Sequence, residues 1–307
     1  MRIFRGFEEA SVINNPVVTT GSFDGVHIGH KTILNRLKML AKKYDGESVL
    51  ITFNPHPRKV LYPETAGKNL KLINSQEEKL ELLRKAGLDN VIIVEFTSEF
   101  SKTTSEQFVR DYLHKILKAK VVVAGFNHHF GFNQEGDYRQ LWALRDKYHF
   151  EAEEIPEQEV QHETVSSTKI RQAIGEGYIQ RANAYLDHYY IIIGKPVEYG
   201  YKNPYLQSGF LKMPLTEECK LIPAPGIYAV SFTSGSDSFK GMTIIKQLEG
   251  DKKEVLFHLI EHEGTQFHKE SALLFHKRIH GSVDLSDHKT AALRITSAMN
   301  EISELIY

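Results

Sequence analysis

The sequence predicts an α/β protein of two domains: a parallel sheet with helices on both faces, followed by a smaller antiparallel β-barrel domain with a C-terminal helix. The chain has 307 residues, which is long for a single hydrophobic core. Its first half alternates short apolar runs with amphipathic segments. After Leu186 the helical periodicity gives way to strand-like runs separated by turn residues. We therefore place the two domains at residues 1–186 and 187–307.

In the first half, short apolar runs predict buried strands. They lie at residues 15–20, 48–53, 91–96 and 121–124. Apolar residues at helical spacing predict helices at residues 31–44, 104–117, 137–148 and 169–186. A capping box at residues 75–78 opens another helix, which should end at Gly87. Continuous apolar strands separated by helices are typical of a parallel sheet covered on both faces, and such sheets bind ligands at the carboxyl ends of their strands.

The second half has the pattern of an antiparallel barrel or sandwich. Strand-like runs lie at residues 189–193, 226–232, 241–248, 254–260 and 271–275. Turn residues such as the Ser-Gly-Ser-Asp segment at 234–237 separate them. A final helix is predicted at residues 287–306, with its apolar residues close to one face.

Composition limits the partners of this chain. Lys and Arg number 38 and Asp and Glu 39, which gives a formal charge of -1, so there is no whole-protein field for nucleic acid, although a local cationic pocket remains open. No apolar run is long enough to cross a bilayer, and the N-terminus lacks the apolar stretch of a signal peptide. The single cysteine, Cys219, excludes an internal disulfide framework and a thiolate-rich zinc site. We expect a cytoplasmic protein with a small anionic ligand, and neither nucleic acid nor a membrane as partner.

The first motif joins the first predicted strand to the first helix. Residues 20–30 read Thr-Gly-Ser-Phe-Asp-Gly-Val-His-Ile-Gly-His. Glycines at a strand-to-helix turn allow the backbone to approach a ligand closely, and a helix N-terminus presents unpaired N–H groups to an anion. His27 and His30 are three residues apart, so both can face that anion and donate hydrogen bonds to phosphate oxygens.

Other interpretations of these residues are weaker but stay open. The glycines do not form the Gly-x-Gly-x-x-Gly pattern of dinucleotide dehydrogenases, and His30 interrupts the Gly-Lys-Thr of a kinase phosphate loop. His27 and His30 could instead bind a metal, although no acidic residue stands beside them at ligand spacing. The turn could also be a solvated connection with incidental histidines.

The second motif, Val-Ser-Ser-Thr-Lys-Ile-Arg at residues 165–171, lies at a predicted helix start. Ser and Thr are strong N-cap residues, so capping alone explains one of the three hydroxyl groups. With Arg171 one turn into the helix, the same residues would form a phosphate clamp, in which a guanidinium group binds two oxygens and hydroxyl groups bind others. We expect the starts of these two helices to converge on a single triphosphate.

The two motifs together are similar to those of the nucleotidyltransferase superfamily, which has a Rossmann-like fold. Two further segments resemble the prokaryotic FAD synthetases. Residues 52–60 contain the Pro-His-Pro segment of that family, and residues 125–131 match its Gly-x-Asp/Asn-x-x-Phe-Gly segment. The four motifs occur in order and span residues 1 to about 186.

The resemblance implies a role for each matching residue. It implies catalytic contacts to the phosphates for His27, His30, Asn127 and Arg171. It implies ATP or phosphate binding for Gly21, Phe23, Asp24, Gly25, Gly29, Ser166, Ser167 and Thr168. It implies flavin binding for Asn54, Pro55, His56, Pro57 and Phe130. Without the family, His56 is interpreted as a rigid loop residue between prolines and Phe130 as a core residue.

The implied reaction is transfer of the adenylyl group of ATP to FMN, with FAD and pyrophosphate as products. The FMN phosphate is already anionic, so catalysis requires positioning and neutralisation of charge rather than a strong base. Mg²⁺ or another divalent cation is expected with ATP. The sequence does not indicate an oligomeric state or the residues that would bind the metal.

The second half departs from the family pattern. Members usually continue into a barrel domain with riboflavin kinase activity, which carries a Gly-Phe-Pro-Thr-Ala-Asn segment and a later catalytic Glu. Here residues 206–216 contain no Pro-Thr-Ala-Asn, and Leu256 occupies the position of the Glu unless a shifted register supplies Glu254. We hypothesise that residues 187–307 keep the barrel fold and have lost kinase activity.

The alternative is a bifunctional enzyme with riboflavin kinase and FMN adenylyltransferase activities. Adenylyl transfer to phosphopantetheine or to nicotinamide mononucleotide is less consistent with the Pro-His-Pro segment. An aminoacyl-tRNA synthetase shares the His-Ile-Gly-His sequence but needs a Lys-Met-Ser-Lys-Ser loop, which this chain lacks. A flavin-binding regulator without catalysis is disfavoured by the presence of His27, His30 and Arg171.

Overall fold

The computed structural model describes the chain except residues 127, 157–158, 161–162, 201–208, 261–270 and 306–307. Contacts between Cα atoms divide it into two compact units. The first consists of Met1–Leu70 and Lys79–Val165, and the second of Lys71–Glu78 and Ser166–Tyr307. The assignment of residues 1–186 and 187–307 to two functional domains stays a prediction.

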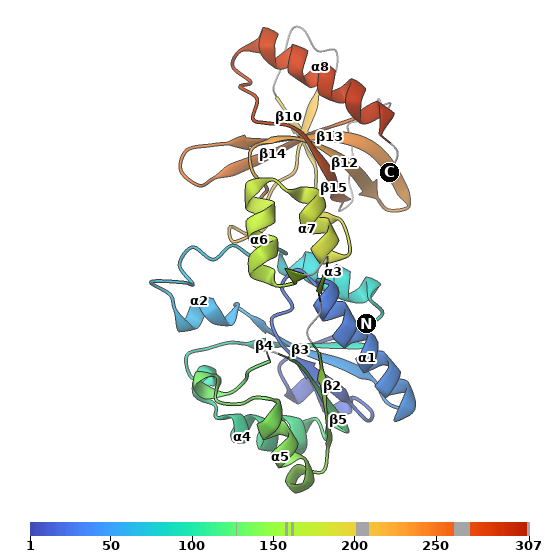
Figure 1. Cartoon of the computed structure of the whole chain (residues 1–307), viewed down its shortest axis with the longest axis vertical. Coiled ribbons are helices and arrows are strands. Elements are labelled where there is room, and N and C mark those ends of the chain that lie inside the picture. Colours follow the sequence, from blue (N-terminus) through green and yellow to red (C-terminus); the bar gives the residue numbers. More distant parts are fainter. Residues whose placement is uncertain (127, 157–158, 161–162, 201–208, 261–270, 306–307) are drawn as a thin grey trace. The chain divides into compact units, whose positions relative to one another are not determined.

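A six-stranded parallel sheet forms the centre of the first unit (Figure 1). Its strands are β1 (Arg2–Arg5), β2 (Val17–Thr20), β3 (Ser48–Asn54), β4 (Asn90–Glu95), β5 (Val121–Gly125) and β6 (Glu151–Ile155). They run in the order β1-β4-β3-β2-β5-β6, and every neighbouring pair is parallel. From the central β2 the chain proceeds to β3 and β4 on one side and later to β5 and β6 on the other. The strand order therefore reverses at β2, where open α/β sheets form ligand crevices.

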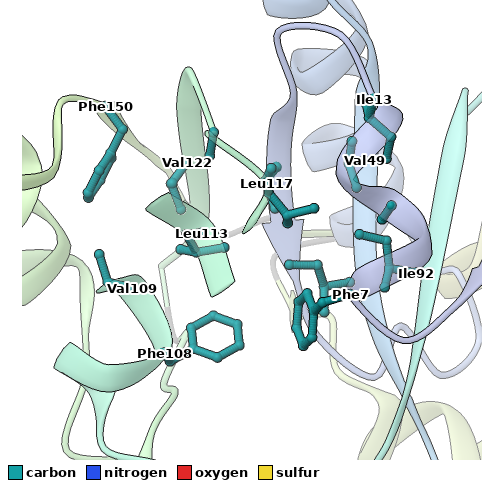
Figure 2. Close-up of a cluster of buried hydrophobic side chains, with 14 of the residues drawn as sticks. Phe7, Ile13, Val49, Ile92, Phe108, Val109, Leu113, Leu117, Val122 and Phe150 are labelled. Atoms are coloured by element: carbon teal, nitrogen blue, oxygen red, sulfur yellow. The ribbon is translucent and has the colours of Figure 1, made fainter. Parts of the chain in front are cut away.

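Helices cover both faces of this sheet, which confirms the predicted fold class. One face packs against α1 (Ile28–Lys43) and α3 (Gln76–Lys85), and the other against the π-helix η3 (Phe108–Ile116) and α5 (Tyr138–Tyr148). Successive strand residues point to opposite faces. Leu50 accordingly lies in the core beside α1, whereas Val49 and Ile51 lie in the core beside η3. Figure 2 shows the second of these cores, with Val49 and Ile92 on one side and Phe108 and Leu113 on the other.

Shorter elements complete the first unit. They are η1 (Glu8–Val12), α2 (Pro57–Leu61), η2 (Phe100–Lys102), α4 (Ser105–Gln107), η4 (Phe132–Gln134), β7 (Glu159–Val160) and β8 (Glu163–Thr164). The predicted helix at residues 104–117 is thus α4 followed by η3. Within it the Leu117 N–H donates to the Tyr112 carbonyl, five residues back, at 3.0 Å, a π-type spacing that apolar periodicity does not distinguish from α.

The second unit contains a seven-stranded antiparallel sheet and a C-terminal helix, as predicted (Figure 1). Its strands are β9 (Tyr190–Gly194), β10 (Val197–Tyr199), β11 (Phe210–Lys212), β12 (Gly226–Ser234), β13 (Asp237–Gln247), β14 (Lys253–Leu259) and β15 (Ser271–His280), in the order β10-β11-β14-β13-β12-β15-β9. Helix α8 (His288–Glu304) buries Ile295 and Ile302 against one face of the sheet. The opposite face is filled by aromatic side chains, including the stacked pair Phe232–Phe257.

The predicted helix at residues 169–186 is two helices, α6 (Ser167–Glu176) and α7 (Ile179–Leu186). The break lies at Gly177, whose φ of 83° is left-handed. The N–H of Gly177 donates to the Ile174 carbonyl and that of Tyr178 to the Ala173 carbonyl, the bonding that terminates many helices at a glycine. No helix in the described part of the chain is both long and apolar enough to span a membrane.

Candidate active site

A cavity of about 540 Å³ opens in the first unit at the carboxyl ends of the parallel strands. Its lining includes Gly21 after β2, His56 after β3, Phe96 after β4, His128 after β5 and Pro156 after β6. Each of these lining residues follows the carboxyl end of a strand. The cavity therefore occupies the crevice that is expected where the strand order reverses.

The first motif forms a strained turn on one wall of this cavity. Phe23, Gly25 and Val26 have φ angles of 49°, 92° and 43°, and only the glycine adopts such a conformation without steric cost. The side chains of Phe23 and Val26 are 3% and 0% exposed, so burial in the core holds the turn in place. Non-glycine residues with positive φ concentrate at ligand-binding sites.

Three aromatic rings stack at the start of α1. The centroids of His27 and His30 are 3.7 Å apart, and those of His30 and Phe23 are 4.3 Å apart. All three residues line the cavity. His27 immediately precedes the first helical residue, Ile28, so the imidazoles lie beside the N–H groups of the first helical turn, which favour an anion.

His30 is held as a neutral imidazole. Burial lowers its pKa well below the usual value, and the nearby His27 and Lys79 side chains lower it further. Its Nδ1 atom is buried and has no hydrogen-bond partner among the described residues. A buried nitrogen of this kind is costly unless a ligand or water satisfies it.

Some of the predicted phosphate-binding residues line the cavity, and others do not. Gly21, Phe23 and Gly29 line it. Asp24 and Gly25 belong to the same turn but are not among the lining residues, and Asp24 is only 4% exposed. Asn127 lies outside the described residues.

The predicted flavin-binding segment follows β3. His56 and Pro57 line the cavity, whereas Asn54 and Pro55 precede them without lining it. His56 is the N-cap of α2, and its Nδ1 accepts a hydrogen bond from the Arg58 N–H at 3.2 Å. A neutral His56 therefore carries its proton on Nε2.

Phe130 belongs to an aromatic wall of the same cavity. The other members are Phe53, Phe96, Phe100 and Phe108. The ring centroids of Phe53 and Phe96 are 5.4 Å apart, and those of Phe108 and Phe130 are 5.9 Å apart. Of these five residues, only Phe130 was predicted from the sequence as a site residue. A signal was present, because Phe53 and Phe96 are the last residues of two predicted strands, and ligands bind at strand ends.

His128 is a cavity residue that was not among the site residues predicted from the sequence. It lines the cavity, and its ring lies parallel to that of Phe130 at 5.9 Å. Burial, reinforced by the nearby His129, lowers the pKa of His128 to about 4. This imidazole is therefore neutral at physiological pH.

The second motif opens α6 in the second compact unit. Ser166 is the N-cap, and its Oγ accepts from the Lys169 N–H at 3.4 Å, so one hydroxyl caps the helix as predicted. Ser167 and Arg171 are half-buried and Thr168 is exposed. The convergence of these groups with the cavity of the first unit stays a prediction.

In the second unit, β14 contains Glu254 and Leu256, the two positions considered for the catalytic carboxylate of a riboflavin kinase. The pairing of β13 with β14 is continuous, so Glu254 and Leu256 face the same side. Leu256 is fully buried in the core beneath α8. The carboxylate of Glu254 accepts hydrogen bonds from Lys212 Nζ at 2.7 Å and from the Tyr199 hydroxyl at 3.1 Å.

Comparison with known proteins shows the family to which this chain belongs. A sequence model of the FAD synthetase family matches residues 10–169, more than half of the chain. The chain belongs to the FAD synthetase family. The match covers the histidine turn, the Pro-His-Pro segment and the segment at residues 125–131, and it ends at Lys169 inside the fourth motif, two residues before Arg171.

Curated relatives extend the similarity beyond the matched region. A "Bifunctional riboflavin kinase/FMN adenylyltransferase" of Listeria monocytogenes is 33% identical over 231 residues, covering 75% of this chain and 72% of the relative. An "FAD synthetase" of the same organism is 35% identical over 178 residues, covering 58% and 71%. The Escherichia coli K12 protein named bifunctional is 26% identical over 285 residues, covering 91% and 90%.

A solved structure shares the whole fold. The crystal structure titled "Macrolide-efflux Protein from Streptococcus pneumoniae" superposes with a TM-score of 0.86, covers all of both chains and is 21% identical. At this identity the likeness concerns the fold alone. It supports the arrangement of a parallel sheet followed by an antiparallel sheet and helix within one chain.

Proposed function

We propose that the chain transfers the adenylyl group of ATP to FMN and so makes FAD and pyrophosphate. The observation that carries this proposal is a single cavity lined both by the histidine turn and by an aromatic wall. An isoalloxazine ring is planar and largely apolar, and aromatic side chains suit it. A strained turn followed by a helix N-terminus suits phosphates. The names of the family's curated members are consistent with both.

The phosphates would be held by backbone and imidazole groups. His27 and His30 stand beside the N-terminus of α1, where they would donate hydrogen bonds to the triphosphate. A phosphate oxygen is a suitable partner for the buried Nδ1 of His30. Asn127, Ser166, Ser167, Thr168 and Arg171 are proposed to complete the phosphate site. Arg171 would stabilise the leaving pyrophosphate.

The reaction requires no protein nucleophile. An FMN phosphate oxygen attacks the α-phosphorus of ATP, a new P–O bond forms, and the bond to the bridging oxygen of pyrophosphate breaks. Because the attacking oxygen is already anionic, no base is needed to remove a proton. Catalysis then consists of alignment and stabilisation of charge on the transferring phosphorus.

A divalent cation would enter with ATP. Among the described residues there is no group of three or more His, Cys, Asp or Glu side chains that could hold a metal. Mg²⁺ typically takes most of its ligands from substrate phosphates and water. We therefore assign Mg²⁺ or another divalent cation to the triphosphate, where it would neutralise charge during the transfer.

We further propose that the second unit lacks riboflavin kinase activity. Leu256, which the family resemblance puts at the position of the catalytic Glu, lies in the core, and the Glu254 carboxylate accepts hydrogen bonds from Lys212 and Tyr199. The alternative is that both activities are present, which the names of the bifunctional relatives favour. The missing Pro-Thr-Ala-Asn segment and the Leu at the carboxylate position favour loss.

Two incubations test both proposals. The purified protein is incubated with MgATP and FMN, and separately with MgATP and riboflavin, and the flavins are separated by chromatography. We expect FAD and pyrophosphate in the first incubation and unchanged riboflavin in the second. No FAD in the first would contradict adenylyl transfer, and FMN or FAD in the second would contradict the loss of kinase activity.

A further inference from the structure

Lys79, in the part of α3 that belongs to the first unit, is a buried lysine beside the histidine turn. Lys79 is only 8% exposed to solvent. Its Nζ atom donates to the Thr52 hydroxyl at 3.1 Å and to the Ser22 carbonyl at 3.4 Å. Lysines are rarely buried to this extent, because an ammonium group loses hydration free energy when it leaves water. A buried cation at this point therefore indicates a role in the adjoining turn.

The first part of that role concerns the Ser22 carbonyl. Ser22 lines the cavity, and its carbonyl also accepts a hydrogen bond from the Thr52 hydroxyl at 3.3 Å. Thr52 belongs to β3 and is fully buried. Lys79 and Thr52 together hold this oxygen toward the sheet. A carbonyl oxygen released into the cavity would place negative partial charge where phosphates are proposed to bind.

The second part concerns charge. Among the described residues, the charged and titratable groups that act on His30 are His27, from the start of α1, and Lys79, from α3. Both lower the pKa of His30, as does burial. A fixed positive charge close enough to act on His30 is also close enough to attract an anion bound beside that imidazole.

We infer that Lys79 is a positioning residue of this cavity, which fixes the Ser22 carbonyl and places a positive charge beside His30. The inference rests on the proposed adenylyl transfer and extends it to a residue outside the four family motifs. Lys79 acts through Ser22 and His30. Replacement of Lys79 by an uncharged residue of similar length should therefore change the pKa of His30 as well as the rate of FAD formation.

The decisive measurement is the titration of His30 in the unliganded full-length protein. Imidazole resonances are followed by NMR in the wild type, Lys79→Met and Lys79→Arg, and a His30→Gln spectrum assigns the signal. Removal of the positive charge should raise the pKa of His30 by about half a unit or more, and Lys79→Arg should leave it near the wild-type value. An unchanged pKa in Lys79→Met would overturn the inference.

Kinetics with ATP and FMN supply a second readout. Lys79→Met should lower kcat/KM for FAD formation about tenfold or more, and Lys79→Arg should restore most of the loss. Thr52→Val keeps the charge and removes one donor to Ser22. It should raise the KM for ATP several-fold while the His30 pKa stays unchanged, and it provides the test if Lys79→Met does not fold.

The outcomes separate this inference from the function on which it rests. Equal losses of activity in Lys79→Met and Lys79→Arg, or an unchanged KM for ATP in Thr52→Val, would overturn the positioning role. A wild-type protein that makes no FAD would contradict adenylyl transfer. The His30 titration would still decide whether Lys79 supplies charge at the turn.

Discussion

At the residue scale, His30 is the side chain for which we propose the most direct contact with the reacting phosphates. It stacks between His27 and Phe23, and burial keeps its imidazole neutral. We expect His30→Ala to lower kcat/KM for FAD formation at least tenfold, because it removes a donor to the reacting phosphates; a tenfold loss corresponds to about 1.4 kcal/mol of transition-state stabilisation. Arg171→Ala should have an effect of at least the same size.

The matched control is His288→Ala, which removes an exposed imidazole at the start of α8. It should leave kcat/KM unchanged. Steady-state rates of pyrophosphate release, measured at saturating FMN, give all three values. Near-normal turnover in both His30→Ala and Arg171→Ala would contradict the assignment of the two motifs to one triphosphate site.

His128 makes stability depend on pH. Its folded pKa is about 4, against an ordinary value of 6.5. As pH falls below 6.5 the unfolded chain takes up a proton that the folded protein does not bind until about pH 4. The stability that His128 contributes is therefore complete above pH 6.5 and declines as pH falls toward 4.

We expect the free energy of unfolding to fall more steeply with acidification in the wild type than in His128→Asn. Between pH 7 and 4.5 the difference should be about 2 kcal/mol. Urea denaturation at the two pH values measures it. Other histidines whose pKa is lowered, such as the half-buried His276, contribute equally to both proteins and cancel. Parallel pH dependence in the two proteins would show that His128 takes up its proton equally in both states.

At the element scale, the start of α3 is fixed by a buried ion pair within the second unit. Lys220 and Glu78 are 4% and 1% exposed and form a salt bridge. Lys220 Nζ also donates to the carbonyls of Ile73 at 2.7 Å and Ile191 at 2.8 Å. The Glu78 carboxylate accepts from the Ile193 N–H at 3.1 Å. Every group has partners, so removal of one member leaves the other charge buried.

Lys220→Met should lower the free energy of unfolding of the second unit by about 3 to 5 kcal/mol. The control Lys277→Met breaks the half-exposed pair with Glu301 and should cost less than about 1 kcal/mol. Chemical denaturation measures both. In a double-mutant cycle, adding Glu78→Gln to Lys220→Met should recover part of the loss. Similar effects of the two lysine variants would show that burial of the Lys220 pair is unimportant.

Elements were predictable where local chemistry decides the conformation. The capping box at Ser75 is present, with the Ser75 N–H donating to Glu78 at 2.9 Å and the Glu78 N–H donating to Ser75 Oγ at 3.2 Å. Strand β6 was not predicted, because its sequence Glu-Ala-Glu-Glu-Ile is mostly charged and its strand conformation comes from pairing with β5. The break at Gly177 was also missed, because a single glycine does not end every helix pattern.

The same division applies to the candidate site. The histidine turn was predictable because its glycines and histidines are close in sequence. The aromatic wall and Lys79 were not, because they come together only through the sheet order. In the sequence Lys79 is one charged residue on an amphipathic helix, and nothing local distinguishes it from the exposed Lys85.

At the scale of the whole molecule, the chain is interleaved between its two compact units. Residues 71–78 belong to the second unit although residues on both sides of them belong to the first. Leu72 pairs with residues 219–221 of the second unit through two backbone hydrogen bonds of 2.7 Å, and Ile73 is fully buried. Helix α3 therefore begins in one unit and ends in the other.

This connectivity predicts how a fragment would behave. Residues 1–186 alone would retain Glu78 but lose Lys220 and the Ile193 N–H. The first turn of α3 would therefore lack the groups that bind the Glu78 carboxylate in the full chain. Because α3 continues from residues 76–78 into the first unit, we expect the first unit to melt about 5 to 10 °C lower in the fragment than in the full chain. Trp142, the single tryptophan, lies on α5 of the first unit, so its fluorescence reports the unfolding of that unit in both proteins.

Glu78→Gln provides the matched comparison. In the full chain it weakens the interaction with Lys220 and should lower the midpoint by several degrees, whereas in the fragment Lys220 is already gone and the change should be below about 2 °C. If the fragment and the full chain melt together, residues 71–78 need nothing from residues 187–307. The adenylyltransferase domain proposed for residues 1–186 would then be independent of the antiparallel sheet.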